Sequence, residues 1–263
     1  MNTNYDPFEF ARSGGLNKDN IIPFKAPVKV PGSTEEVTKV YKRSLLTHDK
    51  YINKNYKFPY NTYALLVSIS TFDKGNKYVY IPKNELWGRI NKMLAYLEQE
   101  YPGAELPTRK SLERHLALLK KEYDVVTLEN HGQELIYKIK TDMNDIYFTR
   151  VYHKQIEQLL TCTNTNTLKV FIILKYTLKE GEYKQVTRKY IAEKLGLSSN
   201  SDNNLRKIGL ILDTLCQLGF ITRKEEYSRE NIKTKYYYKI NSYEEYTEAQ
   251  KRGTTYKQVL KRS

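Results

Sequence analysis

The chain has 263 residues, of which 44 are Lys or Arg and 30 are Asp or Glu, so its net charge is +14. This length predicts one large domain or two small ones. The mean hydropathy is −0.69 and no apolar run approaches the roughly 20 residues of a membrane span, so we expect no membrane partner. The first ten residues contain Asp6 and Glu9 and lack the apolar core of a signal peptide, which favours a cytoplasmic protein.

Residues 1–50 are predicted to form an irregular N-terminal arm. Helix-breaking residues recur through it, namely Pro7, Gly14, Gly15, Pro23, Pro27, Pro31 and Gly32. Order is expected to begin near Phe58, within a first domain at 51–145. Hydrophobic spacing there predicts helices at 60–71, 83–101 and 111–121, and strands at 78–81, 125–128 and 135–139. Thr108 is the expected N-cap of the third helix.

A second domain is predicted at 146–242. Its expected helices lie at 152–160, 167–178, 188–195 and 205–218, and its extended segments at 184–186, 220–224 and 234–240. Thr187 is the expected cap of the third of these helices, and Gly196 ends it. Residues 198–204 form a polar turn and 227–233 a basic loop. A basic C-terminal tail, 243–263, is predicted to start as a polar helix.

The element order of the second domain resembles the winged-helix superfamily, through residues 187–240. The segment from Tyr190 to Leu197 is similar to the first helix and turn of a helix-turn-helix, with small Ala192 at the crossing and Gly196 at the turn. The first domain has the same order from 58 to 140. Aligning Leu112 with Leu205 relates the two last helices, although the middle helix is longer and 98–106 is an insertion. The resemblance implies an α+β fold with two winged helix-turn-helix units in tandem.

The resemblance also implies which residues contact DNA. The second helix of a helix-turn-helix enters the major groove, and the wing contacts phosphates or the minor groove. The implied contacts are Arg109, Lys110, Ser111 and Arg114 in the first unit, Ser201, Asn203, Asn204, Arg206 and Lys207 in the second, and Arg223, Lys224, Arg229, Lys233 and Lys235 in its wing. Residues 188–239 hold eleven Lys or Arg against six Asp or Glu, so the basic charge lies where such a unit needs it. The alternative is that these cations form a solvated face and that the two Asn only cap a helix.

No arrangement typical of an enzyme is found in the sequence. The four His are isolated at positions 48, 115, 131 and 153, and the phosphate-loop, G-x-S-x-G and H-E-x-x-H motifs are absent. Cys162 and Cys216 form no C-x-x-C pair, so we expect two reduced thiols, the second in a core. The prediction is a non-enzymatic protein with no cofactor and no metal site. The helix-turn-helix resemblance also makes His115 a candidate DNA contact of the first unit, but we expect it instead to face water or to pack beside the core.

The two-unit layout and the stretch 60–87 look similar to plasmid and phage replication initiators of Gram-positive bacteria. That resemblance implies sequence-specific binding of double-stranded DNA at origin repeats, with host replication proteins as partners and a homodimer left open. Two alternatives remain. One is a transcriptional regulator of a mobile element that binds a promoter operator, and the other is a winged-helix scaffold that binds proteins instead of DNA.

Overall fold

The structure is a computed structural model that describes residues 21–22, 42–73, 77–141, 148–162, 164–178, 180–228 and 233–252. These residues form an α+β fold with small antiparallel sheets, as expected. The first half contains β1 (Ile21–Ile22), β2 (Lys42–Leu46), α2 (Asp49–Ile52), the 3-10 helix η2 (Lys54–Tyr56), α3 (Tyr60–Ile69), β3 (Thr71–Asp73), β4 (Tyr78–Pro82), α4 (Leu86–Glu100), α5 (Arg109–Lys121), β5 (Val126–His131) and β6 (Glu134–Lys140).

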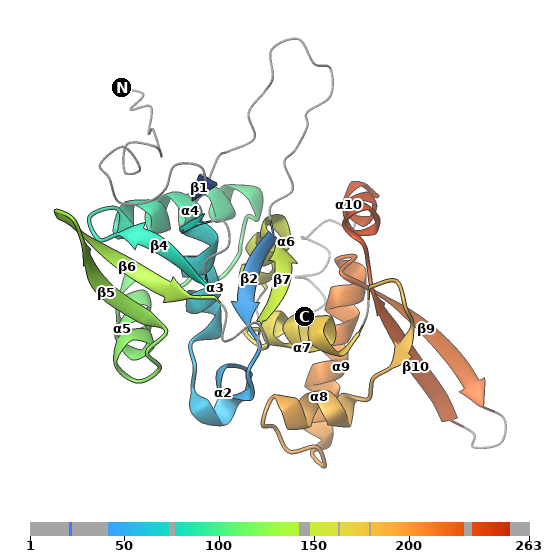
Figure 1. Ribbon diagram of the computed structural model, residues 1–263. Coiled ribbons are helices and arrows are strands. Elements are labelled where there is room, and N and C mark those ends of the chain that lie inside the picture. Colours follow the sequence, from blue (N-terminus) through green and yellow to red (C-terminus); the bar gives the residue numbers. More distant parts are fainter. Residues whose placement is uncertain are drawn as a thin grey trace, which may run out of the picture.

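The second half repeats part of this order. It contains β7 (Phe148–Tyr152), α6 (His153–Leu160), α7 (Thr167–Thr177), β8 (Lys184–Gln185), α8 (Arg188–Lys194), α9 (Asp202–Gln217), β9 (Ile221–Ser228), β10 (Lys233–Ile240) and α10 (Tyr243–Lys251). In both halves a helix, a strand and two helices precede a two-stranded hairpin. The hairpins β5–β6 and β9–β10 lie on opposite sides of the molecule (Figure 1).

The sheet orders repeat as well. The larger sheet has the order β1-β3-β4-β6-β5, and the sheet of the second half has the order β8-β10-β9. In each half the second strand of the hairpin therefore lies between the first strand of the hairpin and an earlier strand: β6 lies between β5 and β4, and β10 lies between β9 and β8. The remaining sheet pairs β2 with β7, which lie between the two halves in Figure 1.

The prediction that order begins near Phe58 is wrong, because β2 and α2 precede it. Leu45 and Leu46 in β2 are completely buried, so the expected irregular arm 1–50 ends in core structure. The strands β3 and β7 were also not predicted. The partner of β2 is β7, about a hundred residues later, and nothing local in the sequence marks such a pairing. The rest of the expected arm, apart from β1, lies outside the described residues.

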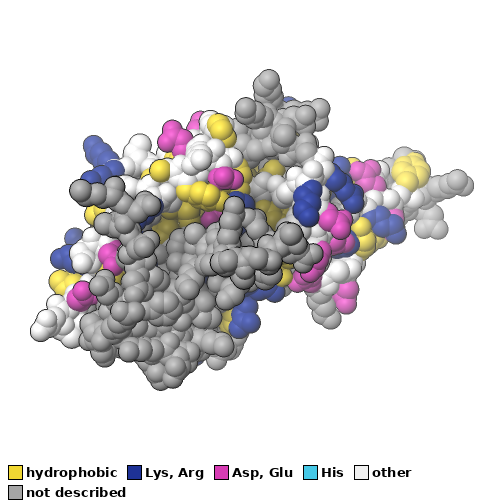
Figure 2. Space-filling view, turned by 90° about the horizontal axis from the view of Figure 1, so that it is seen from above, with side chains coloured by type: hydrophobic (Ala, Val, Ile, Leu, Met, Phe, Trp, Pro, Cys, Tyr) yellow, Lys and Arg dark blue, Asp and Glu magenta, His cyan; other side chains and the backbone are white. Residues whose placement is uncertain are grey.

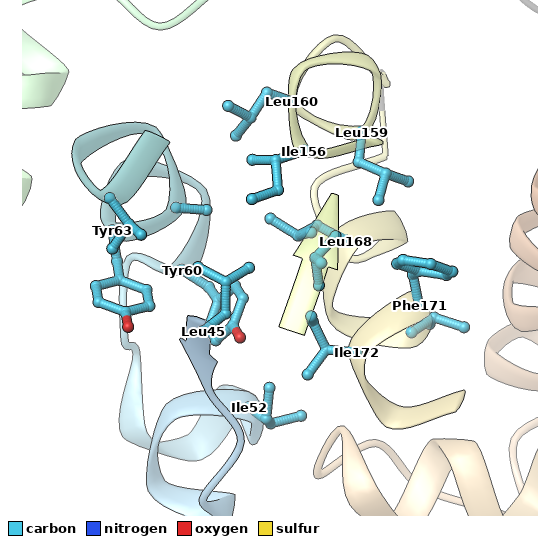
Figure 3. Packing of buried hydrophobic residues seen from close by; sticks show 14 of the residues in the cluster. Leu45, Ile52, Tyr60, Tyr63, Ile156, Leu159, Leu160, Leu168, Phe171 and Ile172 are labelled. Atoms are coloured by element: carbon cyan, nitrogen blue, oxygen red, sulfur yellow. The ribbon is translucent and has the colours of Figure 1, made fainter. Parts of the chain in front are cut away.

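One hydrophobic core cluster runs through both halves. Tyr60 of α3 points toward α7, which contributes Leu168 and Ile172, and Leu45 of β2 lies beside Tyr60 (Figure 3). Nearly every residue of α3 and the first eight of α7 are buried, so these two helices form the centre of the molecule. A shared core of this kind predicts that the two halves unfold together.

Two further contacts join the halves. At the first, the backbone N–H of Lys54 donates to the carbonyl of Leu195 at 2.9 Å, and the ammonium of Lys194 lies 3.4 Å from Asp49. Gly196, which has φ +69°, packs against Asn53 so closely that a Cβ would lie 2.0 Å from its side-chain oxygen. Glycine at position 196 therefore has two functions: it adopts the positive φ of the turn after α8, and it leaves room for Asn53 at the start of η2.

At the second contact, polar side chains connect α4, α6 and α10. The ammonium of Lys154 donates to the hydroxyl of Tyr96 at 2.6 Å and lies 3.6 Å from the buried carboxylate of Glu157. The hydroxyl of Tyr246 donates to Gln158 at 2.9 Å, and both partners are buried. The hydrogen bond between Lys154 and Tyr96 thus joins α4, the long middle helix of the first half, to α6, the first helix of the second half.

Several element boundaries differ from the predictions. The helix expected at 205–218 is α9 and begins three residues earlier, at Asp202, because Ser201 caps it. The helix expected at 83–101 is α4 and begins at Leu86. The loop expected at 227–233 is shorter than predicted, because β9 and β10 pair as far as Ser228 and Lys233. The polar helix predicted at the start of the C-terminal tail is α10, and residues 253–263 lie outside the described part.

Candidate nucleic-acid interface

Two capped helices, α5 and α9, carry most of the residues predicted to bind DNA. The hydroxyl of Thr108 accepts a hydrogen bond from the backbone of Ser111 at 3.3 Å, and that of Ser201 accepts one from the backbone of Asn204 at 3.4 Å. Each bond satisfies one of the free N–H groups at a helix start. The two caps have the same sequence separation as Leu112 and Leu205, so the predicted correspondence between the helices also holds for their starts.

On α5, the predicted residues occupy the first two turns. Arg109 is exposed, but its guanidinium pairs with Glu113 at 3.0 Å and lies over the ring of Trp87 with its centroid at 4.8 Å. Lys110 and Arg114 are exposed, and Ser111 is half-buried. This end of α5 therefore presents two exposed cations, Lys110 and Arg114, whereas the guanidinium of Arg109 is already bound by Glu113 and Trp87.

His115 does not belong to the exposed end of α5. Its Nδ1 lies 2.7 Å from the hydroxyl of Thr62 in α3, so it packs beside the core. Burial, and to a smaller extent the charge of Arg114, lowers the pKa of His115 below its usual value. A neutral imidazole in this hydrogen bond indicates a structural role.

On α9, the earlier start changes the expected roles. Ser201 is the N-cap, and the side-chain amide of Asn204 donates to the carbonyl of Ser198 at 3.2 Å, so both residues stabilise the turn before the helix. This is the capping alternative considered for the Asn pair, and here it applies to Asn204. Exposed side chains at i, i+3, i+4 and i+7 form the outward stripe of the helix: Asn203, Arg206, Lys207 and Leu210.

The predicted wing residues divide into separate groups. Arg223 stands at the start of β9, where Asp213 of α9 and Glu225, at 3.3 Å, both bind its guanidinium. Lys224 pairs with Glu226 at 2.8 Å, whereas Lys235 is exposed on β10. Lys233 opens β10, and Arg229 lies outside the described residues. Arg223 thus holds the sheet to α9, and its side chain does not extend from the tip of the hairpin.

A groove between α8 and α9 was not predicted. It has a volume of about 430 Å³ and is lined by Arg188, Asp202, Leu205, Arg206, Gly209, Leu210 and Asp213. Leu210 is 48 % exposed although it is a large apolar residue. Sequence spacing identified Arg206 but not Arg188, because Arg188 belongs to the preceding helix and meets α9 only in the folded chain.

The other predicted chemistry can be compared with the described residues. Within these, no group of His, Cys, Asp and Glu is arranged to hold a metal ion. Cys162 and Cys216 are free and partly buried against the core, and burial raises the pKa of Cys216 to about 11 and that of Cys162 to about 12. No helix in the described part is long and apolar enough to span a bilayer.

The face of the molecule shown in Figure 2 carries charged side chains of both signs. On this face, basic and acidic side chains are both scattered over the described surface, among hydrophobic and other side chains. Comparison with protein-family models, with curated proteins and with solved structures found no match.

Proposed function

We propose that this protein is a non-enzymatic, sequence-specific DNA-binding protein made of two winged-helix units in tandem. The observation that carries the proposal is the repeated arrangement of α3-β4-α4-α5-β5-β6 and α7-β8-α8-α9-β9-β10, each with its last strand between the other two. Helix, strand, two helices and a hairpin in this sheet order are typical of a winged helix. In such a unit the second helix of the helix-turn-helix enters the major groove.

The exposed chemistry of α5 and α9 supports double-stranded DNA as the ligand. Arg bonds guanine and Asn bonds adenine in the major groove, and an apolar side chain contacts the methyl group of thymine. Arg206, Asn203 and Leu210 supply these three types on one stripe of α9. A protein-binding scaffold would have no need of this combination, so the scaffold alternative is the weaker one.

The contacts between the halves support one continuous binding site. Because the core and the contacts of Lys54 and Lys194 join the two units, one chain would cover about two major-groove segments, or roughly 20 base pairs. We propose that the biological role is initiation of plasmid or phage replication at origin repeats, together with host replication proteins. A transcriptional regulator that binds a promoter palindrome is the alternative.

Footprinting tests the proposal. Purified protein is bound to fragments of its own replicon or genome neighbourhood at near-physiological salt, with Lys251→Ala as a control that removes an exposed charge from α10. Protected direct repeats beside an A+T-rich segment support an initiator, and one protected palindrome over a promoter supports a regulator. A footprint limited to a single half-site contradicts the tandem arrangement, and the absence of any salt-resistant binding contradicts DNA recognition.

A further inference from the structure

The groove between α8 and α9 contains an arginine in an unusual position. Arg188 is the first residue of α8, and its guanidinium lies against the backbone of α9 at Gly209. A Cβ built on Gly209 would be 2.9 Å from the Cζ of Arg188, closer than such contacts normally come. The guanidinium of Arg188 can therefore lie at this position only because Gly209 has no side chain.

The first half has no such space. The residue of α5 that corresponds to Gly209 is Leu116, which is partly buried and packs against the core. A glycine in the middle of a helix costs stability relative to alanine. Gly209 lies on the groove side of α9, where it admits an arginine, and no turn or positive φ requires it there.

The two arginines that line the groove, Arg188 and Arg206, are available to bind an anionic ligand. Among the described residues, neither Arg188 nor Arg206 has a carboxylate within ion-pair distance. The groove also contains Asp202 and Asp213, but Arg223 already binds Asp213. Arg188 is exposed to solvent, so its guanidinium is both positioned by the helix below it and open to a ligand from outside.

We propose that Arg188 binds a phosphate of the DNA backbone beside the bases contacted by α9. The inference rests on the proposed function, and it assigns a contact to a residue that the sequence analysis did not include among the DNA contacts. In a helix-turn-helix the first helix crosses the backbone while the second reads base edges, which fits Arg188 on α8 and Arg206 on α9. A guanidinium binds phosphate oxygens through two parallel hydrogen bonds, and the contact with α9 holds its plane in place.

The test is a double-mutant cycle of Arg188→Ala and Gly209→Ala. Binding is measured over a salt series with a 20-base-pair duplex that carries the footprinted site, and with an unrelated duplex of the same length. Arg188→Ala is expected to weaken binding to both duplexes about fivefold to tenfold and to reduce the salt slope by about one, because one phosphate contact is lost. Lys251→Ala should change neither quantity.

Gly209→Ala separates this contact from folding. The three atoms nearest to the new methyl group all belong to the flexible end of Arg188, and alanine favours the helix, so the melting temperature should not fall. Affinity should nevertheless drop about as far as in Arg188→Ala, and the double variant should lose no more than either single variant. Additive losses, or a salt slope that Arg188→Ala leaves unchanged, would overturn the inference.

Failure of this inference is distinguishable from failure of the proposed function. If Arg206→Ala weakens binding to the footprinted duplex while Arg188→Ala has no effect on either duplex, the protein binds DNA but Arg188 holds no phosphate. If the unaltered protein binds both duplexes equally and Arg206→Ala has no effect, the proposed function itself is wrong, and the inference is overturned with it.

Discussion

The two halves use the same order of elements but differ in what their helices carry. The central helix of the first half, α3, has no charged residue, whereas α7 has Lys169 and Lys175. On the outer helices, Arg109 is held by Glu113 and Trp87, whereas Arg206 has no ion pair among the described residues. The central helix of the first half is thus the more apolar of the two, and Arg109 is less available to a ligand than Arg206.

The largest expected effect tests whether the shared core joins the halves. Leu119 and Leu212 are fully buried at corresponding positions of α5 and α9, so changing either to Ala should lower the free energy of unfolding by about 3 kcal/mol. The single Trp, Trp87, lies in the first half, so its fluorescence reports that half while circular dichroism reports both. Leu212→Ala should shift both signals equally; a shift in circular dichroism alone would mean that the halves unfold separately.

Lys169 tests the difference between the central helices. It is 8 % exposed, and burial lowers its pKa to about 8. Below pH 8 both folded and unfolded chains are protonated, and the folded chain bears the full cost of the buried charge. Lys169→Met should therefore raise the free energy of unfolding at pH 7 by about 3 kcal/mol, because the pKa falls from 10.5 to about 8 and each pKa unit corresponds to about 1.4 kcal/mol.

The pH dependence of this effect has a definite sign. As the pH rises from 8 towards 10.5, the folded chain loses the proton of Lys169 before the unfolded chain does, and the advantage of Lys169→Met should shrink. Urea unfolding at pH 7 and pH 10 measures the change. An advantage that is equal at both values would show that packing of the apolar methionine side chain, and not removal of charge, is responsible.

The two arginines on α5 and α9 sharpen the comparison of the surfaces that are proposed to bind DNA. Arg206→Ala should weaken binding to the specific duplex by about 1.5 kcal/mol, roughly tenfold, and binding to unrelated DNA much less. Arg109→Ala should have the same selectivity but a smaller effect, since Arg109 must share its guanidinium with Glu113. Lys224→Ala should affect both duplexes equally, as a phosphate contact would. Identical selectivity for all three variants would refute the division into helix and wing roles.

The smallest effects concern the caps. Thr108→Ala and Ser201→Ala each remove one hydrogen bond at a helix start and should each cost about 1 kcal/mol. Denaturant unfolding measures both, with Thr108→Ser and Ser201→Thr as controls that keep the hydroxyl. A loss in only one of the two would show that the helices are not equivalent in how they begin.

Local patterns predicted most helices and the hairpins correctly. Hydrophobic spacing identified α3, α4, α5 and α7, and the caps Thr108 and Thr187 are as predicted. The prediction of α9 started too late because several polar residues in 198–204 were equally good caps and no local feature selects Ser201. The candidate site was predicted as individual cations, without the carboxylates that bind Arg109, Arg223 and Lys224.

The sequence by itself determined the elements, their order and the basic charge of the second half, because helix periodicity, caps and turn residues act over a few positions. Only the tertiary structure decided that β2 pairs with β7, that one core cluster serves both halves and that Arg188 lies over Gly209. These features join residues far apart in the chain, or on different helices. Their energies come from surfaces that meet only after the helices have packed.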